Sequence, residues 1–176
     1  MRYKAAADAT REGNAEAVSA AAREALFERV ADPDEAPGVR LWASRAVADL
    51  EPERAVELFS QLEAQGIPID GDAWTVLGPI ALPKLMQRCP EPPCDQTTLL
   101  MIGLIISDSP TDERCREAVP FLLREANHSA SQKWLAYQAL GGFRQQLIPL
   151  LEGLEQHEDA VVRREASAAL AAVAQE

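Results

Sequence analysis

Apolar side chains recur every three or four residues along most of the chain, and polar side chains occupy the positions between them. Val162, Ala166, Ala169 and Leu170 show this spacing near the C-terminus. It is the period of a helix with one buried face. Short breaks containing proline, glycine, serine or aspartate separate such segments. The pattern therefore predicts an all-α fold of antiparallel helical hairpins.

Capping residues and prolines predict where these helices begin and end. Asn14 is the expected cap of a helix from Ala15 to Val30, and a second helix over residues 39–50 completes the first hairpin. Residues 67–78 are expected to hold only a short or bent helix. Further helices are expected at residues 51–64, 79–88, 96–106, 109–126, 132–140, 145–155 and 159–174. The helix over residues 96–106 is almost wholly apolar, so we expect burial on most of its sides.

Two kinds of segment alternate along the chain. In the first, a proline stands among apolar residues, as in residues 82–86, 119–122 and 148–151. The second carries a basic residue at its second position and small or apolar residues after it, as in residues 39–47, 132–140 and 162–170. A period of about 30 to 40 residues is typical of stacked helical hairpins.

This alternation resembles the HEAT repeat, and the chain is similar to bacterial HEAT-like proteins. The resemblance implies an α-solenoid of about five hairpins, one of them degenerate, in a single domain over residues 1–176. It is best over residues 78–176, moderate over 15–50 and poor over the irregular 51–77. The spacing of Asp159 and Arg163 matches a pair that ties neighbouring repeats in this family. Leu100 and Leu104 depart from the pattern, which has small residues there.

Composition and charge narrow the function. Hydrophobic residues make up 47% of the 176 residues and aromatic residues 5%, which suits closely packed helices. The net charge of −11 makes nucleic-acid binding an unfavourable interpretation. Residues 99–106 form the longest strongly apolar run, which is too short to span a bilayer, and no charged-then-apolar leader is visible. We expect a cytoplasmic protein that has no membrane partner.

The three cysteines leave two interpretations open. Cys89 and Cys94 flank a proline-rich loop that brings their sulfur atoms near each other. They could form a reversible disulfide. The interpretation that we favour is a rigid connector with two incidental thiols, because the cytosol keeps most thiols reduced.

Catalytic and metal-binding patterns are not found in the sequence. Cys115, His128 and His157 lack the paired spacings of a zinc site, and His157 is better explained by a capping turn. Neither a glycine-rich phosphate loop nor a nucleophile elbow is present. We expect a non-enzymatic protein that binds no metal or cofactor.

The second helices of a solenoid line one surface, usually the concave one, and their outward positions are the expected docking residues. Trp134 and Tyr137 would share one helix face. The alternative is that Trp42, Trp74 and Trp134 fill gaps between repeats. The candidate partner-binding residues are Arg40, Arg45, Lys133, Trp134, Tyr137, Arg163 and Arg164.

The sequence leaves three functions open, and the third is the least favoured. The first is a scaffold or adaptor that binds a protein partner through the second helices, as a monomer or weak homodimer. The second is an immunity protein whose acidic surface blocks a basic toxin domain. The resemblance also leaves open a tetrapyrrole (bilin) lyase. The partner and the pathway are not named by the sequence.

Overall fold

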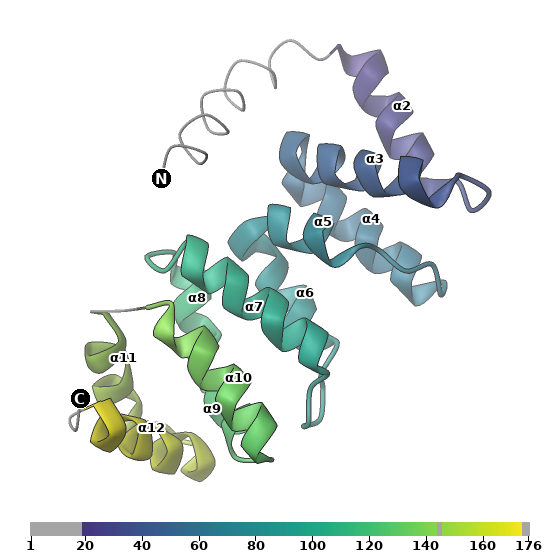
Figure 1. The fold of residues 1–176 in the computed structure, drawn as a ribbon. Coiled ribbons are helices and arrows are strands. Elements are labelled where there is room, and N and C mark those ends of the chain that lie inside the picture. The colour runs from purple at the N-terminus through teal and green to yellow at the C-terminus, as the bar shows by residue number, and fades with distance from the viewer. Residues whose placement is uncertain (1–18, 144–145, 174–176) are drawn as a thin grey trace. The chain divides into compact units, whose positions relative to one another are not determined.

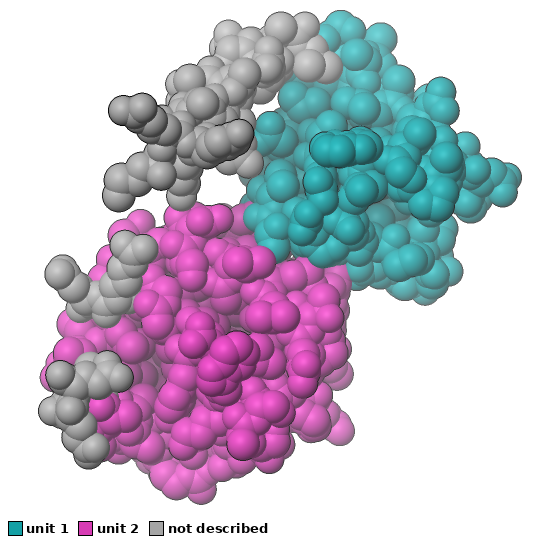
Figure 2. Space-filling view, viewed as in Figure 1, with its two compact units in different colours: residues 1–77 teal, residues 78–176 magenta. Residues whose placement is uncertain are grey.

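A computed structural model describes residues 19–143 and 146–173. These residues form helices joined by short turns, and no β-strand occurs among them, so the predicted all-α class is confirmed (Figure 1). The chain divides into two compact units, residues 1–77 and 78–176 (Figure 2). The single domain expected from the sequence stays a prediction. In the two described ranges, every helix is too short or too polar to cross a bilayer.

The described part of unit 1 is built around a central helix, α3. Its elements are α2 (Ala20–Ala31), α3 (Pro37–Leu50), α4 (Pro52–Ala64) and α5 (Gly71–Val76). Helices α2, α4 and α5 all pack against α3. Ser19 caps α2 by accepting a hydrogen bond from the Ala22 amide at 3.2 Å, so this helix begins at Ala20 and the expected start at Ala15 was wrong. Asn14, the expected cap, lies outside the described residues. Helix α5 is short, as predicted for residues 67–78.

The core of unit 1 is organised around an aromatic pair. Trp74 on α5 is 1% exposed, and its ring meets that of Phe59 on α4 edge to face at a centroid distance of 5.5 Å. The indole Nε1 donates a hydrogen bond to Glu63 at 3.0 Å, so the polar atom of this buried ring is satisfied. Trp74 therefore fills a gap between helices, as one of the two interpretations of the tryptophans predicts.

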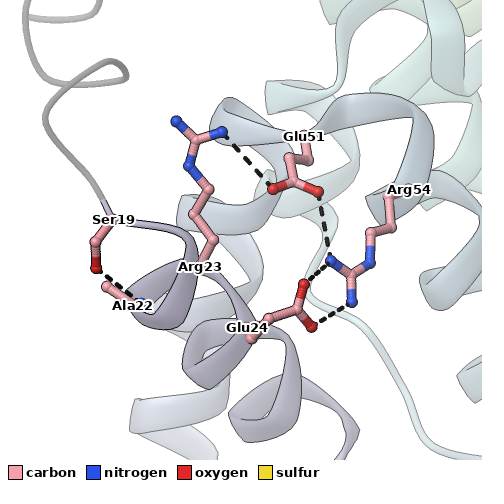
Figure 3. A network of polar contacts seen from close by, with 6 residues as sticks. All are labelled: Ser19, Ala22, Arg23, Glu24, Glu51 and Arg54. Carbon is pink, nitrogen blue, oxygen red and sulfur yellow. Dashed lines mark hydrogen bonds and ion pairs between the residues drawn. The ribbon is translucent and has the colours of Figure 1, made fainter.

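Charged side chains join α2 to α4 on the surface of unit 1. Arg54 on α4 donates to both carboxylate oxygens of Glu24 on α2, at 2.6 and 2.7 Å, and lies 3.5 Å from Glu51 (Figure 3). Hydrogen bonding to Arg54 lowers the pKa of Glu24. Because that pKa is lower in the folded chain, the ion pair stabilises unit 1 near neutral pH. This stabilisation is lost as the pH falls through the lowered pKa of Glu24.

Unit 2 consists of short first helices and longer second helices. Its elements are the 3-10 helix η1 (Gly78–Ala81) and the α-helices α6 (Leu82–Gln87), α7 (Gln96–Asp108), α8 (Glu113–Glu117), α9 (Val119–Ala126), α10 (Ala130–Gly141), α11 (Leu147–Leu154) and α12 (Ala160–Val173). Helix α10 packs against α7 and α9, and α12 packs against α9 and α11.

Three prolines of unit 2 stand in the first turns of helices, where they do not break a continuous helix. Pro83 and Pro120 stand in the first turns of α6 and α9, directly after η1 and α8. Pro149 is the third residue of α11. A proline lacks the N–H that an interior helical position donates, whereas the first turn needs no such donor. The expectation of single helices over residues 79–88 and 109–126 was therefore wrong.

Candidate functional site

The outer side of α7 and α10 carries large apolar side chains. Leu100 and Leu104 on α7 are 52% and 58% exposed, and Trp134 on α10 is 61% exposed. Lys133 is exposed and Tyr137 is half-buried on the same helix as Trp134. Helices α7 and α10 run side by side (Figure 1). We call Leu100, Leu104 and Trp134 the α7–α10 face.

The exposure of α7 corrects the expectation that this helix is buried on most sides. Its buried residues are Thr98, Leu99, Met101, Ile102, Ile105 and Ile106, which form one face. That face packs against α10 and α6. No described element covers the opposite face, so two leucines stay in contact with solvent. A helix that is apolar on all sides is buried only on the sides where other helices pack against it.

Small residues allow α7 and α10 to approach closely. A Cβ atom added to Gly103 would lie 3.3 Å from the Cβ of Ala139. One added to Gly142 would lie 2.9 Å from the Ser107 hydroxyl and 3.0 Å from its backbone nitrogen. Gly103 therefore lies near Ala139 and Ser107 near Gly142, so the two helices run parallel.

The charge of this surface differs from that of the whole chain. Among the exposed positions of α7 and α10, Lys133 and Asp108 are the charged residues. The Lys133 ammonium lies 5.4 Å from the centre of the Tyr137 ring, a cation–π distance. The chain as a whole has a net charge of −11, whereas the exposed positions of these two helices are mostly uncharged.

The loop before α7 is held by the adjacent hairpin. Cys89 and Cys94 form a disulfide, contrary to the favoured expectation of two free thiols. The buried Glu125 carboxylate accepts a hydrogen bond from the Cys94 amide at 2.8 Å, and the buried Gln132 side-chain amide donates to the Cys94 carbonyl. The next residue, Asp95, caps α7 by accepting from the Thr98 amide. These contacts place the start of α7 against α9 and α10.

Thiol titration tests the disulfide and the state of Cys115. Burial, with a smaller effect of the nearby Asp112 charge, raises the pKa of the Cys115 thiol to about 11. Since the thiolate is the reactive form, we expect the native protein near pH 8 to react very slowly with Ellman's reagent. Unfolding in urea without a reductant should expose one thiol, and prior reduction should expose all three cysteines of the chain.

The control for this titration is Cys115→Ser, which should leave no thiol in the unreduced, unfolded protein. Three thiols in the unreduced wild-type protein would contradict the disulfide. Because disulfides are rare in the cytosol, the same titration on protein trapped with acid from native cells also tests the predicted cytoplasmic location.

Two of the predicted docking arginines bind the loops that precede their own helices. Arg40 donates to the carbonyls of Asp32 and Pro33 at 2.6 and 2.9 Å. Arg163 donates to the carbonyls of His157 and Glu158 at 2.6 and 2.8 Å. The arginine at the second position of the sequence pattern therefore closes a loop in both places.

The expected link between neighbouring hairpins uses Asp159 but not Arg163. The Asp159 carboxylate lies 3.7 Å from the Arg124 guanidinium, and this ion pair joins the start of α12 to α9. Arg163 instead donates hydrogen bonds within its own hairpin. The exposed Arg164 donates to Asn127 at the end of α9 and to Glu165 on its own helix. Arg164 thus lies close to the turn that leads into α10, where Lys133 is located.

A second exposed aromatic surface lies on unit 1. Trp42 is 66% exposed, and the Arg45 guanidinium lies 5.2 Å from the centre of its ring. Arg45 is also ion-paired with Asp70 and Asp72. A groove of about 500 Å³ lies nearby. It is lined by Pro37, Gly38, Arg40, Leu41, Ser44, Pro68, Ile69 and Asp70.

The cysteine cluster and His157 are already engaged in other bonds. Within the described residues, the cluster of possible metal ligands is Cys89, Cys94 and Asp95, and its sulfur atoms are bonded to each other. They therefore present no thiolate to an ion. His157 Nδ1 accepts a hydrogen bond from the Asp159 amide at 3.0 Å, so the predicted capping turn before the last helix is confirmed.

The structure brings together only part of the predicted docking set. Lys133, Trp134 and Tyr137 lie on one helix of unit 2, whereas Arg40 and Arg45 lie on α3 of unit 1. Sequence reasoning missed Leu100 and Leu104 as surface residues. A signal was nevertheless present, because these two leucines are the positions where α7 departs from the repeat pattern. Comparison with models of known protein families, with curated proteins and with solved structures finds no match.

Proposed function

We propose that this chain is a HEAT-like α-solenoid protein that binds a protein partner through the α7–α10 face and catalyses no reaction. The observation that carries the proposal is the exposure of Leu100, Leu104 and Trp134 on two adjacent helices. Contiguous exposed apolar side chains mark interaction sites, and tryptophan is among the residues that most often anchor an interface. Parallel second helices that present such residues are what a scaffold of helical hairpins requires.

The charge of the face favours a scaffold over an immunity protein that acts through this surface. Neutralisation of a basic toxin domain needs a cluster of carboxylates at the interface. The exposed positions of α7 and α10 hold one carboxylate, Asp108, and one cation, Lys133. The negative charge of the chain therefore lies elsewhere, and no observation at this face favours a tetrapyrrole lyase.

Affinity capture from native lysate tests the proposal. Trp134→Ala and Leu104→Glu should each weaken capture of a stoichiometric partner at least tenfold, since truncation of an interface anchor costs about 2 kcal/mol or more. Both side chains are more than half exposed, so circular dichroism should show that the variants stay folded. Affinities should then be measured with the purified partner.

The matched control is Trp42→Ala, which removes the other exposed tryptophan of the described residues from unit 1. Its capture of the partner should equal that of the wild-type protein. Equal capture by all the variants, or loss with Trp42→Ala alone, would rule out the α7–α10 face as the binding surface.

A further inference from the structure

We propose that Cys89, Cys94 and Asp95 bind a Zn²⁺ ion when the disulfide between the two cysteines is reduced. The site lies in the loop between α6 and α7, and it goes beyond the binding of a protein partner. It also departs from the sequence-based expectation that the chain binds no metal. The proposal follows from the atoms that the fold brings together, from the contacts that hold the loop and from the ligands that the ion prefers.

The fold places three ligand atoms close together at the start of α7. The sulfur atoms of Cys89 and Cys94 and a carboxylate oxygen of Asp95 lie within 4.8 Å of one another. Around a tetrahedral Zn²⁺ ion, with Zn–S bonds of about 2.3 Å and Zn–O bonds of about 2.1 Å, such atoms are about 3.6–3.8 Å apart. The three atoms are therefore near the separations that the ion requires, except that the bonded sulfur atoms must move apart.

Reduction allows the two sulfur atoms to separate with little movement of the backbone. The Cα atoms of Cys89 and Cys94 lie 5.0 Å apart, and rotation about each Cα–Cβ bond moves one sulfur atom independently of the other. A dithiol supplies the two electrons and two protons that convert the disulfide to two thiols, and the dithiol itself becomes a disulfide. Binding of Zn²⁺ then releases both thiol protons to water, because the thiolate is the metal ligand.

Hydrogen bonds other than the disulfide hold this loop in place. The Cys94 amide donates to the buried Glu125 carboxylate at 2.8 Å, and the Cys94 carbonyl accepts from the buried Gln132 side chain. At the other end of the loop, the Cys89 amide donates to the Met86 carbonyl at 3.1 Å. Reduction breaks none of these hydrogen bonds, so the two thiols stay close to each other. Ligands that are already positioned lose less conformational entropy when the ion binds.

The third ligand, Asp95, is positioned by the helix that it caps. Its Oδ1 accepts a hydrogen bond from the Thr98 amide at 2.9 Å. Each carboxylate oxygen has two lone pairs, so the cap leaves positions at which an ion can bind. Asp95 is exposed, and it therefore gives an ion a route from solvent to the buried sulfur atoms. Three protein ligands leave the fourth position of a tetrahedral ion to water.

The ligand set determines which ion fits. Two thiolates suit Zn²⁺, whereas Mg²⁺ and Ca²⁺ bind to oxygen ligands. The carboxylate beside the thiolates disfavours Cu⁺, which selects soft sulfur ligands. The two positive charges of Zn²⁺ also offset two of the three negative charges that the ligands carry. In the disulfide state the sulfur atoms present no thiolate, so binding depends on reduction.

Spectroscopic titration of the full chain with Co²⁺ tests the site. Co²⁺ is used as the probe because it occupies tetrahedral Zn²⁺ sites and its bonds to thiolates give a charge-transfer band in the near ultraviolet. The chain is reduced with dithiothreitol, which is then removed without air. We expect one Co²⁺ per reduced chain, a charge-transfer band and displacement of Co²⁺ by Zn²⁺ but not by Ca²⁺. The disulfide-bonded chain should give no band.

Four variants assign the ligands. Asp95→Asn keeps a helix cap, since asparagine caps about as well as aspartate, but it removes the carboxylate. We expect it to lower the affinity for Zn²⁺ at least about tenfold while circular dichroism stays unchanged. Cys89→Ser and Cys94→Ser should each abolish the two-thiolate band. Cys115→Ser, which removes the buried cysteine of α8, should leave both the band and the affinity unchanged.

The expected pattern requires reduction, both loop cysteines and the carboxylate. The absence of a band from the reduced chain, or its loss with Cys115→Ser, would overturn the proposal. Equal Zn²⁺ affinity of Asp95→Asn and the wild-type chain would overturn the three-ligand site. None of these results changes the test of the proposed function, which uses Leu104 and Trp134.

Discussion

Replacing Trp74 with alanine is expected to lower the free energy of unfolding of unit 1 by about 3–5 kcal/mol. The side chain is 1% exposed and its ring meets Phe59 at 5.5 Å, so alanine leaves a cavity between α4 and α5. It also removes the donor to Glu63. Urea denaturation followed by circular dichroism measures the loss, and Trp74→Phe, which keeps much of the ring volume, should cost less.

The matched control for Trp74→Ala is Trp42→Ala in the same unit. Trp42 is 66% exposed, so its truncation should change the free energy of unfolding by less than about 1 kcal/mol. If both substitutions cost the same, Trp74 would not hold α4 and α5 together. Amide hydrogen exchange should show the loss of protection in residues 52–77 of the destabilised variant.

Replacing Glu125 with alanine is expected to lower the free energy of unfolding of unit 2 by about 2–4 kcal/mol. Glu125 is 1% exposed and accepts the Cys94 amide at 2.8 Å, so the substitution leaves a buried donor without a partner and opens a small cavity. Glu125→Gln keeps an acceptor and should cost about 1 kcal/mol. Urea denaturation at neutral pH compares the variants.

The control for Glu125→Ala is Glu117→Ala, an exposed carboxylate on α8. Its effect should be within about 0.5 kcal/mol of zero. Equal losses for the two variants would mean that the Glu125 contact with Cys94 contributes nothing. A double-mutant cycle with Gln132→Ala should give a coupling energy, because both side chains bind the backbone of Cys94.

Local signals predicted the helices well. Asp95 and Ser129 cap α7 and α10 with the hydrogen bonds that their side chains suggest. Pro37 stands in the first turn of α3, and Gly66, with a φ of 81°, follows α4 in the left-handed region that glycine favours. Each of these features depends on a few consecutive residues, so a single sequence reports it.

The same local signals failed where a helix start or the contact of a side chain depended on packing. Single helices were expected over residues 79–88 and 109–126, but Pro83 and Pro120 stand in the first turns of new helices. The arginine pattern was recognised, but Arg40 and Arg163 were assigned to docking, while their guanidinium groups bind loop carbonyls. A periodic pattern shows that a residue recurs; the partner of its side chain depends on the path of the loop.

The three tryptophans also separate what the local sequence predicts from what packing decides. Sequence reasoning could not tell a gap-filling tryptophan from a docking one, since all three occur in helical segments with similar neighbours. Trp74 is buried because α4 brings Phe59 and Glu63 to it, and Trp42 and Trp134 are exposed because no described element covers them. Burial is a property of neighbours that are distant in sequence.

The amino-acid sequence alone established the helical class, most helix boundaries and the candidate Lys133–Trp134–Tyr137 segment, because periodicity and capping act within a few residues. The tertiary structure decided that Leu100 and Leu104 face solvent, that Cys89 is bonded to Cys94, and that Glu125 holds the loop before α7. Each of these outcomes depends on which helix lies against which other helix. Helix packing is set by the whole set of buried side chains, and no local pattern encodes it.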